Sequence, residues 1–247
     1  MAKPYIRDNK VKFRLRKKIT GHSLVDICGL NKYKKPGDVI LQLLGFYTPA
    51  FDPKYRFRGN NAEQLARIYY SKKLGFEIVF YTEEQLKACY YDVFNDDDYF
   101  GGVPDIEIPK DLFLVEVKSK SMKDYDEIVS KGNLPLDEVY QGMYYAYKRN
   151  YPKFRMFYVF YDEETEKILF EGGTPTTYKN VMIFEKEFDV DREDIEAKMK
   201  HAQQYYNWCY TNGYVPLEDI SDKVLIEMGL KKDNNGKWWN NILADRY

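Results

Sequence analysis

The residues best suited to chemistry lie in one short stretch of the sequence, Gly101–Ser121. Its second half, Leu112–Lys118, has the alternating pattern of a β-strand, and Glu116 and Lys118 are two residues apart within it. Because side chains alternate faces along a strand, this carboxylate and this ammonium lie on one face. Asp105, on the preceding predicted strand, reaches the same place if the two strands form a hairpin.

Two carboxylates and a backbone oxygen form a hard-oxygen site of the kind that Mg²⁺ prefers. Here the oxygens come from Asp105, Glu116 and the carbonyl of Val117. A neighbouring lysine, Lys118, can orient an attacking water as the ammonium or deprotonate it as the neutral amine. Together these groups suit metal-assisted hydrolysis of a phosphodiester. The alternative interpretation is an ordinary ion pair on an exposed strand, and acid-x-Lys alone is a weak signal.

The remaining sequence predicts elements that could position these residues. Apolar periodicity, caps and breakers predict helices over Pro36–Gly45, Asn60–Leu74, Asp137–Arg149, Asp191–Asn212 and Ser221–Leu230. Strands are predicted over Phe76–Tyr81, Phe100–Ile108, Leu112–Lys118, Arg155–Tyr161 and Val181–Phe188. Helices first, then a small mixed sheet, then alternating helix and strand indicate an α/β fold.

Length and charge predict how the chain is organised. A chain of 247 residues fits a single domain. We divide it into a basic helical part (1–58), a catalytic core (59–188) and a C-terminal helix with a tail (189–247). Residues 1–58 contain 14 Lys and Arg against 4 Asp and Glu, whereas the whole chain has a net charge of −1. This basic part either attracts a polyanion such as DNA or is a solvated arm.

Composition excludes several classes of protein. No apolar run is long enough for a membrane helix, and no signal-peptide stretch follows the N-terminus. With only His22 and His201, a histidine metal cluster is excluded. The three cysteines have neither disulfide nor metal-site spacing, which favours a reducing, cytoplasmic setting. They are Cys28, Cys89 and Cys209.

The motif order resembles that of the PD-(D/E)XK nuclease superfamily. The residues that carry this resemblance are Pro104 and Asp105, followed by Glu116, Val117 and Lys118. It implies a restriction-endonuclease-like α/β core, which is a small mixed β-sheet flanked by helices.

Three further features resemble one branch of that superfamily. Glu63 lies where the superfamily has an acidic residue on its first core helix. Gln141 and Tyr145 match a Gln-x-x-x-Tyr motif, and Ile19–Gly45 is similar to the N-terminal signature of the YqaJ-type viral recombinase nucleases. These enzymes are relatives of phage lambda exonuclease.

The resemblance also implies roles for individual residues. Metal ligation is implied for Asp105, Glu116, the Val117 carbonyl and Glu63, with Mg²⁺ as the ion and Mn²⁺ as the alternative. Lys118 would position the nucleophile, and Gln141 would orient Lys118 or the phosphate. DNA contacts are implied for Arg16, Ser23 and Tyr145, the first two at a terminal 5′-phosphate. Some nucleases of this branch hold an iron–sulfur cluster with four cysteines, but this chain has three, so no cluster is expected.

The function implied is a Mg²⁺-dependent 5′-to-3′ exonuclease on linear double-stranded DNA, used in phage recombination. A single-strand annealing protein as partner and a ring-shaped homo-oligomer are implied as well. So is a phage- or prophage-encoded protein in the cytoplasm of a bacterial host. Two alternatives stay open, namely a structure- or sequence-specific endonuclease on the same core and a DNA-binding protein whose nuclease core is vestigial.

Overall fold

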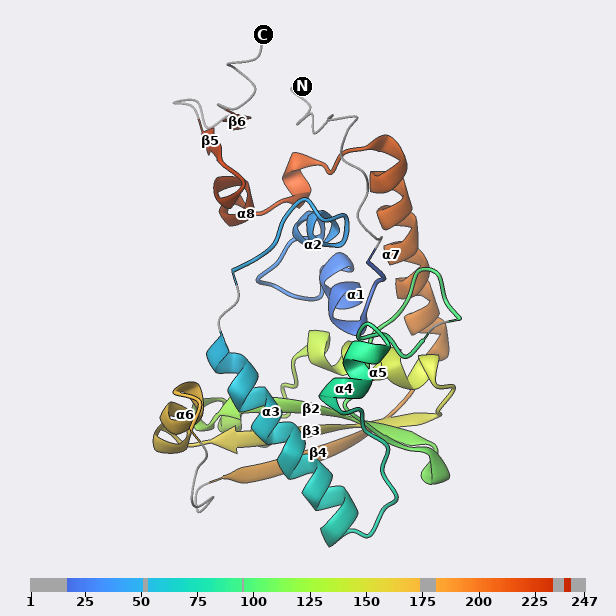
Figure 1. Cartoon of the computed structure of the whole chain (residues 1–247), viewed down its shortest axis with the longest axis vertical. Helices are drawn as coiled ribbons and strands as arrows, with labels where there is room; N and C mark the ends of the chain where they lie inside the picture. Colours follow the sequence, from blue (N-terminus) through green and yellow to red (C-terminus); the bar gives the residue numbers. More distant parts are fainter. Residues whose placement is uncertain (1–16, 51–52, 95, 174–180, 233–237, 241–247) are drawn as a thin grey trace.

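The computed structural model describes residues 17–50, 53–94, 96–173, 181–232 and 238–240 (Figure 1). The α-helices are α1 (Gly21–Ile27), α2 (Pro36–Leu43), α3 (Pro53–Ile68), α4 (Glu83–Ala88), α5 (Leu136–Lys148), α6 (Glu163–Phe170), α7 (Arg192–Asn212) and α8 (Asp222–Glu227). The strands are β1 (Ile106–Ile108), β2 (Phe113–Ser121), β3 (Lys153–Tyr161), β4 (Met182–Asp189), β5 (Leu230–Lys232) and β6 (Trp238–Asn240). None of the helices in these ranges has the length and apolarity to cross a membrane.

A mixed four-stranded sheet lies at the centre, in the order β1-β2-β3-β4. β1 and β2 form an antiparallel hairpin, β2 and β3 are parallel, and β4 is antiparallel to β3. α5 lies in the crossover between the two parallel strands, as a parallel connection requires. The structure therefore confirms the predicted fold class, a small mixed sheet flanked by helices.

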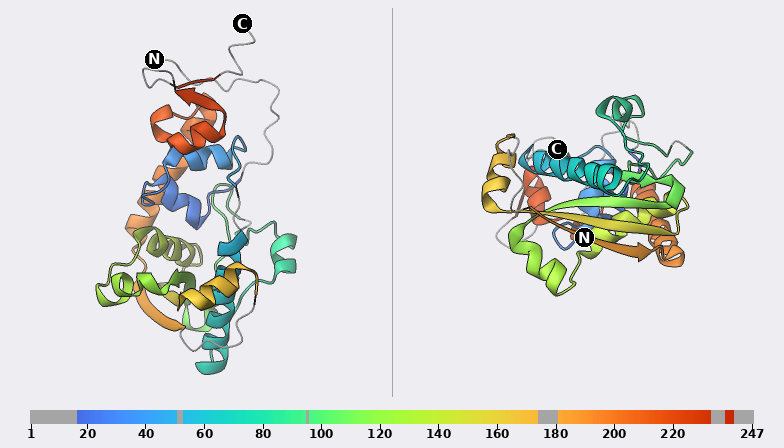
Figure 2. Two further views of the ribbon diagram at one scale, coloured as in Figure 1. Left: turned by 90° about the vertical axis from the view of Figure 1, so that its left-hand side faces the viewer. Right: turned by 90° about the horizontal axis from the view of Figure 1, so that it is seen from below.

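The two faces of the sheet bury different side chains. Val115 and Val117 of β2 pack with Ala62 and Ala66 of α3, which crosses one face of the sheet (Figure 2). Leu114 of β2 points the other way, into a core shared with α5, α1, α2 and α7. The alternation predicted from the sequence is thus confirmed. It places Glu116 and Lys118 on the α5 side of the sheet.

Most of the predicted elements are present, with shifted ends. The predicted helix from Asn60 is longer, since α3 starts at Pro53 and continues into a π-helical turn, Tyr69–Lys73. The first strand of the predicted hairpin is shorter, because β1 covers only Ile106–Ile108. Three helices, α1, α4 and α6, were not predicted from the sequence, although each begins with a side-chain N-cap.

The strand predicted over Phe76–Tyr81 is wrong. Only Val79 pairs there, in a single bridge with Glu107 of β1. Val79 and Phe80 are each 38% exposed, so this apolar run covers the edge of the sheet without entering it. β1 is itself only three residues long, so the run finds a single bridge on this edge and not a ladder.

Gly142 lets α5 approach β3 closely. A Cβ atom at this position would lie 2.7 Å from Cδ2 of Phe154 and 3.2 Å from Sδ of Met156. The helix that carries Gln141 and Tyr145 can therefore lie against the sheet only because residue 142 has no side chain.

We expect Gly142→Ala to lower the free energy of unfolding by about 1–2 kcal/mol, because overpacking outweighs the gain in helix propensity. The control is Gly59→Ala in α3, where no heavy atom would lie within 4 Å of the new Cβ. That variant should be more stable by about 0.8–1 kcal/mol. Urea unfolding followed by circular dichroism measures both, and a Gly142→Ala protein as stable as the native chain would contradict the packing described here.

Candidate active site

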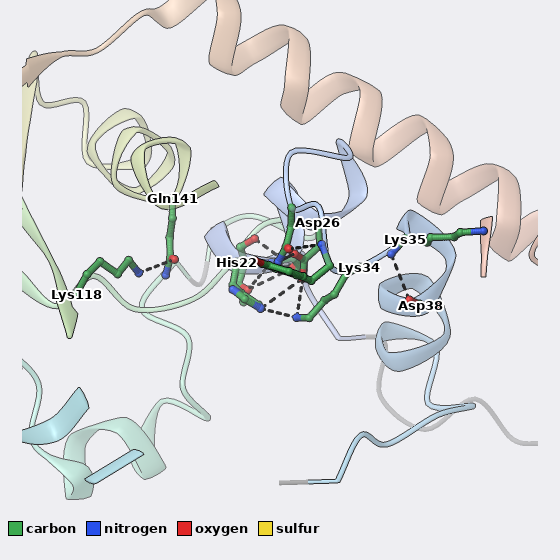
Figure 3. A network of polar contacts seen from close by, with 11 residues as sticks. His22, Asp26, Lys34, Lys35, Asp38, Lys118 and Gln141 are labelled. Atoms are coloured by element: carbon green, nitrogen blue, oxygen red, sulfur yellow. Dashed lines mark hydrogen bonds and ion pairs between the residues drawn. The ribbon is translucent and has the colours of Figure 1, made fainter. Parts of the chain in front are cut away.

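Lys118 lies between a carboxylate and an amide. Its Nζ donates to Oε1 of Glu116, two residues earlier on β2, at 2.7 Å. It also donates to Oε1 of Gln141 on α5 at 2.8 Å, and Figure 3 shows these two side chains pointing toward one another. The strand and the crossover helix therefore meet in a polar contact at this point.

Asp105 reaches the same place from the residue before β1. Ile106 pairs with Val115, so the hairpin brings Asp105 level with Glu116. Its Oδ2 accepts a hydrogen bond from the backbone N–H of Val117 at 2.7 Å. The carboxylate is thus fixed on the backbone between Glu116 and Lys118, as the hairpin prediction required.

The two carboxyl groups are forced together in a buried position. Glu116 is only 1% exposed. Burial, followed by the negative charge of Asp105, raises the pKa of Glu116 to about 8, although Lys118 opposes the shift. Burial also raises the pKa of Asp105. Without a further cation, this arrangement of charges is unfavourable.

Lys118 itself stays protonated. Burial lowers the pKa of Lys118, but the charges of Glu116 and Asp105 outweigh burial and raise the pKa well above its usual range. In this state the side chain is a hydrogen-bond donor with a full positive charge. It is therefore suited to orienting an oxygen atom and not to accepting a proton.

Glu63 approaches the site from α3, on the other side of the sheet. Burial and the charge of Asp105 raise the pKa of Glu63 to about 7, with Arg67 and Lys118 opposing. Arg67 donates to Glu63 Oε2 at 2.8 Å, and its guanidinium lies 4.5 Å from the ring centroid of Phe80. Arg67 was not predicted as a site residue, although its spacing of four from Glu63 on a predicted helix is a usable signal.

The donor set fits a divalent cation with oxygen ligands. Oε2 of Glu116 is buried and has no hydrogen-bond partner among the described residues, so one carboxylate oxygen is available for a cation. Mg²⁺ is commonly held by one or two carboxylates together with waters. Within the described ranges, no three His, Cys, Asp or Glu side chains form a ready metal cluster. The candidate ligands are therefore Asp105, Glu116 and the Val117 carbonyl, with Glu63 turned toward Arg67.

Tyr145 lies one helical turn after Gln141 and is 4% exposed. Burial, and then the charges of Glu116 and Asp105, raise its pKa far above the usual value, so the phenol stays protonated. A Cβ at Gly102 would lie 2.6 Å from its hydroxyl oxygen, which explains the glycine at this position. Tyr145 therefore borders the carboxylates, and its contact with DNA stays a prediction.

Of the two residues expected at a 5′-phosphate, the structure describes Ser23. Arg16 lies outside the described residues. Ser23 is 7% exposed and forms a capping box with Thr20, in which Thr20 N donates to Ser23 Oγ at 2.7 Å. The hydroxyl of Ser23 thus already stabilises the start of α1, and phosphate binding by Ser23 stays a prediction.

His22 belongs to a separate network on α1 (Figure 3). The fully buried Asp26 accepts from Asn31 at 2.8 Å and from Lys34 at 2.9 Å. Lys34 Nζ lies 2.7 Å from His22 Nε2. This network ties the loop after α1 back onto the helix.

Comparison with known sequences gives a family. The sequence model of the YqaJ-like viral recombinase domain matches residues 11–148, which include every candidate residue named above. The uncharacterized protein MG373 of Mycoplasma genitalium is 30% identical over 149 residues, which cover 56% of this chain and 51% of that protein. Its homolog in Mycoplasma pneumoniae is 28% identical over 149 residues, covering 55% and 50%. The chain thus spans about half the length of these relatives.

Two solved structures share the fold. The phage related exonuclease from Haemophilus somnus 129PT has a TM-score of 0.54 and 17% identity, covering 80% of this chain and 96% of that chain. LHK-Exo, an alkaline exonuclease from Laribacter hongkongensis, was solved in complex with dAMP. That complex has a TM-score of 0.50 and 15% identity, covering 79% of this chain and 93% of that chain.

A divalent cation should stabilise this protein. At ten times its Kd, Mg²⁺ is expected to add about 1.4 kcal/mol to the free energy of unfolding. For a chain of this length that raises Tm by about 3–6 °C. Glu116→Gln should lose the shift, because the amide removes the negative charge and one of the candidate ligand oxygens.

Differential scanning calorimetry with and without MgCl₂ measures both shifts. Glu163→Gln is the matched control, because this carboxyl on α6 is 77% exposed and pairs with Lys123 away from the sheet interior. A Glu116→Gln protein that Mg²⁺ stabilises as much as the native chain would exclude Glu116 as a ligand.

Proposed function

The chain belongs to the family of YqaJ-like viral recombinase domains, and on this premise we propose that it is a metal-dependent deoxyribonuclease. The observation that carries the proposal is the convergence of Asp105, Glu116, Lys118 and Gln141. The Lys118 ammonium lies 2.7 Å from one carboxylate and 2.8 Å from the amide. Family membership supports a nuclease that acts on DNA; metal dependence, direction and end requirement are finer proposals.

In this proposal the residues of this chain would hold the cation and the phosphate in place. Asp105, Glu116 and the Val117 carbonyl would bind Mg²⁺, and Glu63 would support its water shell. When bound, the ion would polarise the phosphodiester and lower the pKa of a coordinated water. Asp105 is held by the Val117 N–H, so the two carboxylates keep their spacing without substrate.

Lys118 would orient the attacking water or a phosphate oxygen. An ammonium has three N–H donors, and two of them point to Glu116 and Gln141. These two hydrogen bonds fix the rotation of the ammonium and therefore the direction of its third N–H. Gln141 would hold the ammonium from α5, so that the position of the ammonium does not depend on Glu116 alone.

We further propose linear double-stranded DNA as the substrate, degraded from 5′ to 3′. Support comes from the lambda-type resemblance and from the basic balance of residues 1–58. Arg16 and Ser23 would hold a terminal 5′-phosphate, with Tyr145 at the border of the site. A ring-shaped homo-oligomer and a single-strand annealing protein as partner belong to the same proposal. So do Mn²⁺ as a substitute for Mg²⁺, one nuclease domain, and a phage- or prophage-encoded protein in the bacterial cytoplasm.

Digestion of end-labelled DNA tests this function. With Mg²⁺, linear duplex carrying a 5′ label should release labelled mononucleotide first, and a 3′ label should persist. Closed circular plasmid should stay intact, and EDTA should stop the reaction. Cleavage of the circle would favour the endonuclease alternative, and salt-sensitive binding without any product would favour the vestigial one.

Asp105→Ala and Lys118→Met should each reduce the rate by about 10²–10⁴ while the circular dichroism spectrum is kept. The matched control is Asp111→Ala, an exposed acid in the turn of the same hairpin, which should keep the native rate. Native activity in the Asp105→Ala protein would remove this carboxylate from the mechanism and with it the proposed site.

A further inference from the structure

β2 and α5 are joined by a second polar contact beside the first. Lys118 and Lys120 are two residues apart on β2 and face α5, and Glu138 and Gln141 are three apart on α5 and face β2. Lys118 donates to Gln141 at 2.8 Å, and Lys120 donates to Glu138 Oε1 at 2.7 Å. The same strand and helix are therefore connected twice, once in the candidate active site and once next to it.

Stability does not explain the second contact. The side chains of Lys120 and Glu138 are only 20% and 17% exposed. Tyr158 is fully buried, lies directly opposite Lys118 in the β2–β3 register and also neighbours Glu138, whose charge adds to burial in raising the pKa of the phenol. A largely buried ion pair is often no more stable than apolar residues of the same volume.

The start of α5 is tied to α7, where Tyr140 donates to Asp194, and toward β2 the polar contact of its first turn among the described residues is that of Glu138 with Lys120. The N-cap residue of α5 is Pro135, and no side chain there accepts a hydrogen bond from the helix. The contacts that Val139 and Met143 make with the core are apolar, and apolar contacts are non-directional, so they do not by themselves set where the Gln141 amide points. Gln141, one turn further on, needs a position accurate to a few tenths of an ångström to keep its hydrogen bond.

We propose that Lys120 and Glu138 are a positioning pair, which fixes the first turn of α5 on β2 and thereby holds the Gln141 amide against the Lys118 ammonium. The pair itself does not touch substrate or metal. The inference rests on the proposed nuclease function only for its kinetic consequence. Its structural part, the placement of Gln141 on Lys118, stands without that function.

The double variant Lys120→Met with Glu138→Leu separates positioning from stability. Because apolar residues replace a largely buried ion pair, Tm should stay the same or rise. On linear duplex DNA, kcat should fall at least tenfold, with KM and the midpoint of the Mg²⁺ titration within twofold of native values. Exchanging the charges, as Lys120→Glu with Glu138→Lys, restores the link and should return kcat to at least half of the native value.

A matched control is Lys153→Met with Glu187→Leu. This pair also has an N–O distance of 2.7 Å but joins β3 to β4 and is 48% and 38% exposed. Its kcat should be unchanged. Native kcat in the Lys120→Met, Glu138→Leu protein would overturn the proposal. A raised KM with native kcat would also overturn it, because Lys120 would then bind DNA directly. A fall in Tm large enough to account for the loss of activity would overturn it as well.

A readout without catalysis keeps the two proposals apart. Proton–nitrogen NMR detects lysine ammonium groups that exchange slowly, and the signal that disappears in Lys118→Arg identifies Lys118. We expect that signal in the native protein and its loss in the double variant. If the native chain shows no nuclease activity but the signal behaves so, the proposed function fails and the positioning pair stands. If the double variant keeps the signal, the positioning pair is wrong whatever the activity.

Discussion

The fold of this protein must keep several carboxyl groups close together in a place with little water. Burial raises the pKa of Asp105, Glu116 and Glu63, and the charge of Asp105 raises the pKa of Glu116 and Glu63 further. Lys118 and Arg67 offset part of this cost from opposite sides of the sheet. The rest of the core has to supply the stability that this cluster removes, as is common for functional sites.

The architecture shows how that is achieved. The two faces of the sheet bury separate apolar clusters, one with α3 and one with α5. The hairpin of β1 and β2 then brings Asp105 to the backbone of Val117 at the boundary between them. Charged side chains thus enter from the strand, the hairpin and both helices, while most of the side chains buried between these elements are apolar.

The sequence predicted the parts of this design that depend on local order. Strand alternation fixed the side of β2 on which Glu116 and Lys118 lie, and the turn predicted the hairpin that places Asp105. The four-residue spacing of Gln141 and Tyr145 placed both on one helical face. Periodicity is a property of neighbouring residues, so it can be read before any tertiary contact is known.

The tertiary structure decided the distances between the elements. The run Phe76–Tyr81 did not become a strand, because pairing needs an open edge and only Val79 reaches one. The capping role of Ser23, the paired state of Glu63 and the contact between Lys120 and Glu138 likewise depend on which surfaces meet. The sequence by itself determined which chemical groups are present and which way each one faces. Only the packed sheet and helices determined their separations, and electrostatic energies and hydrogen bonds depend on those separations.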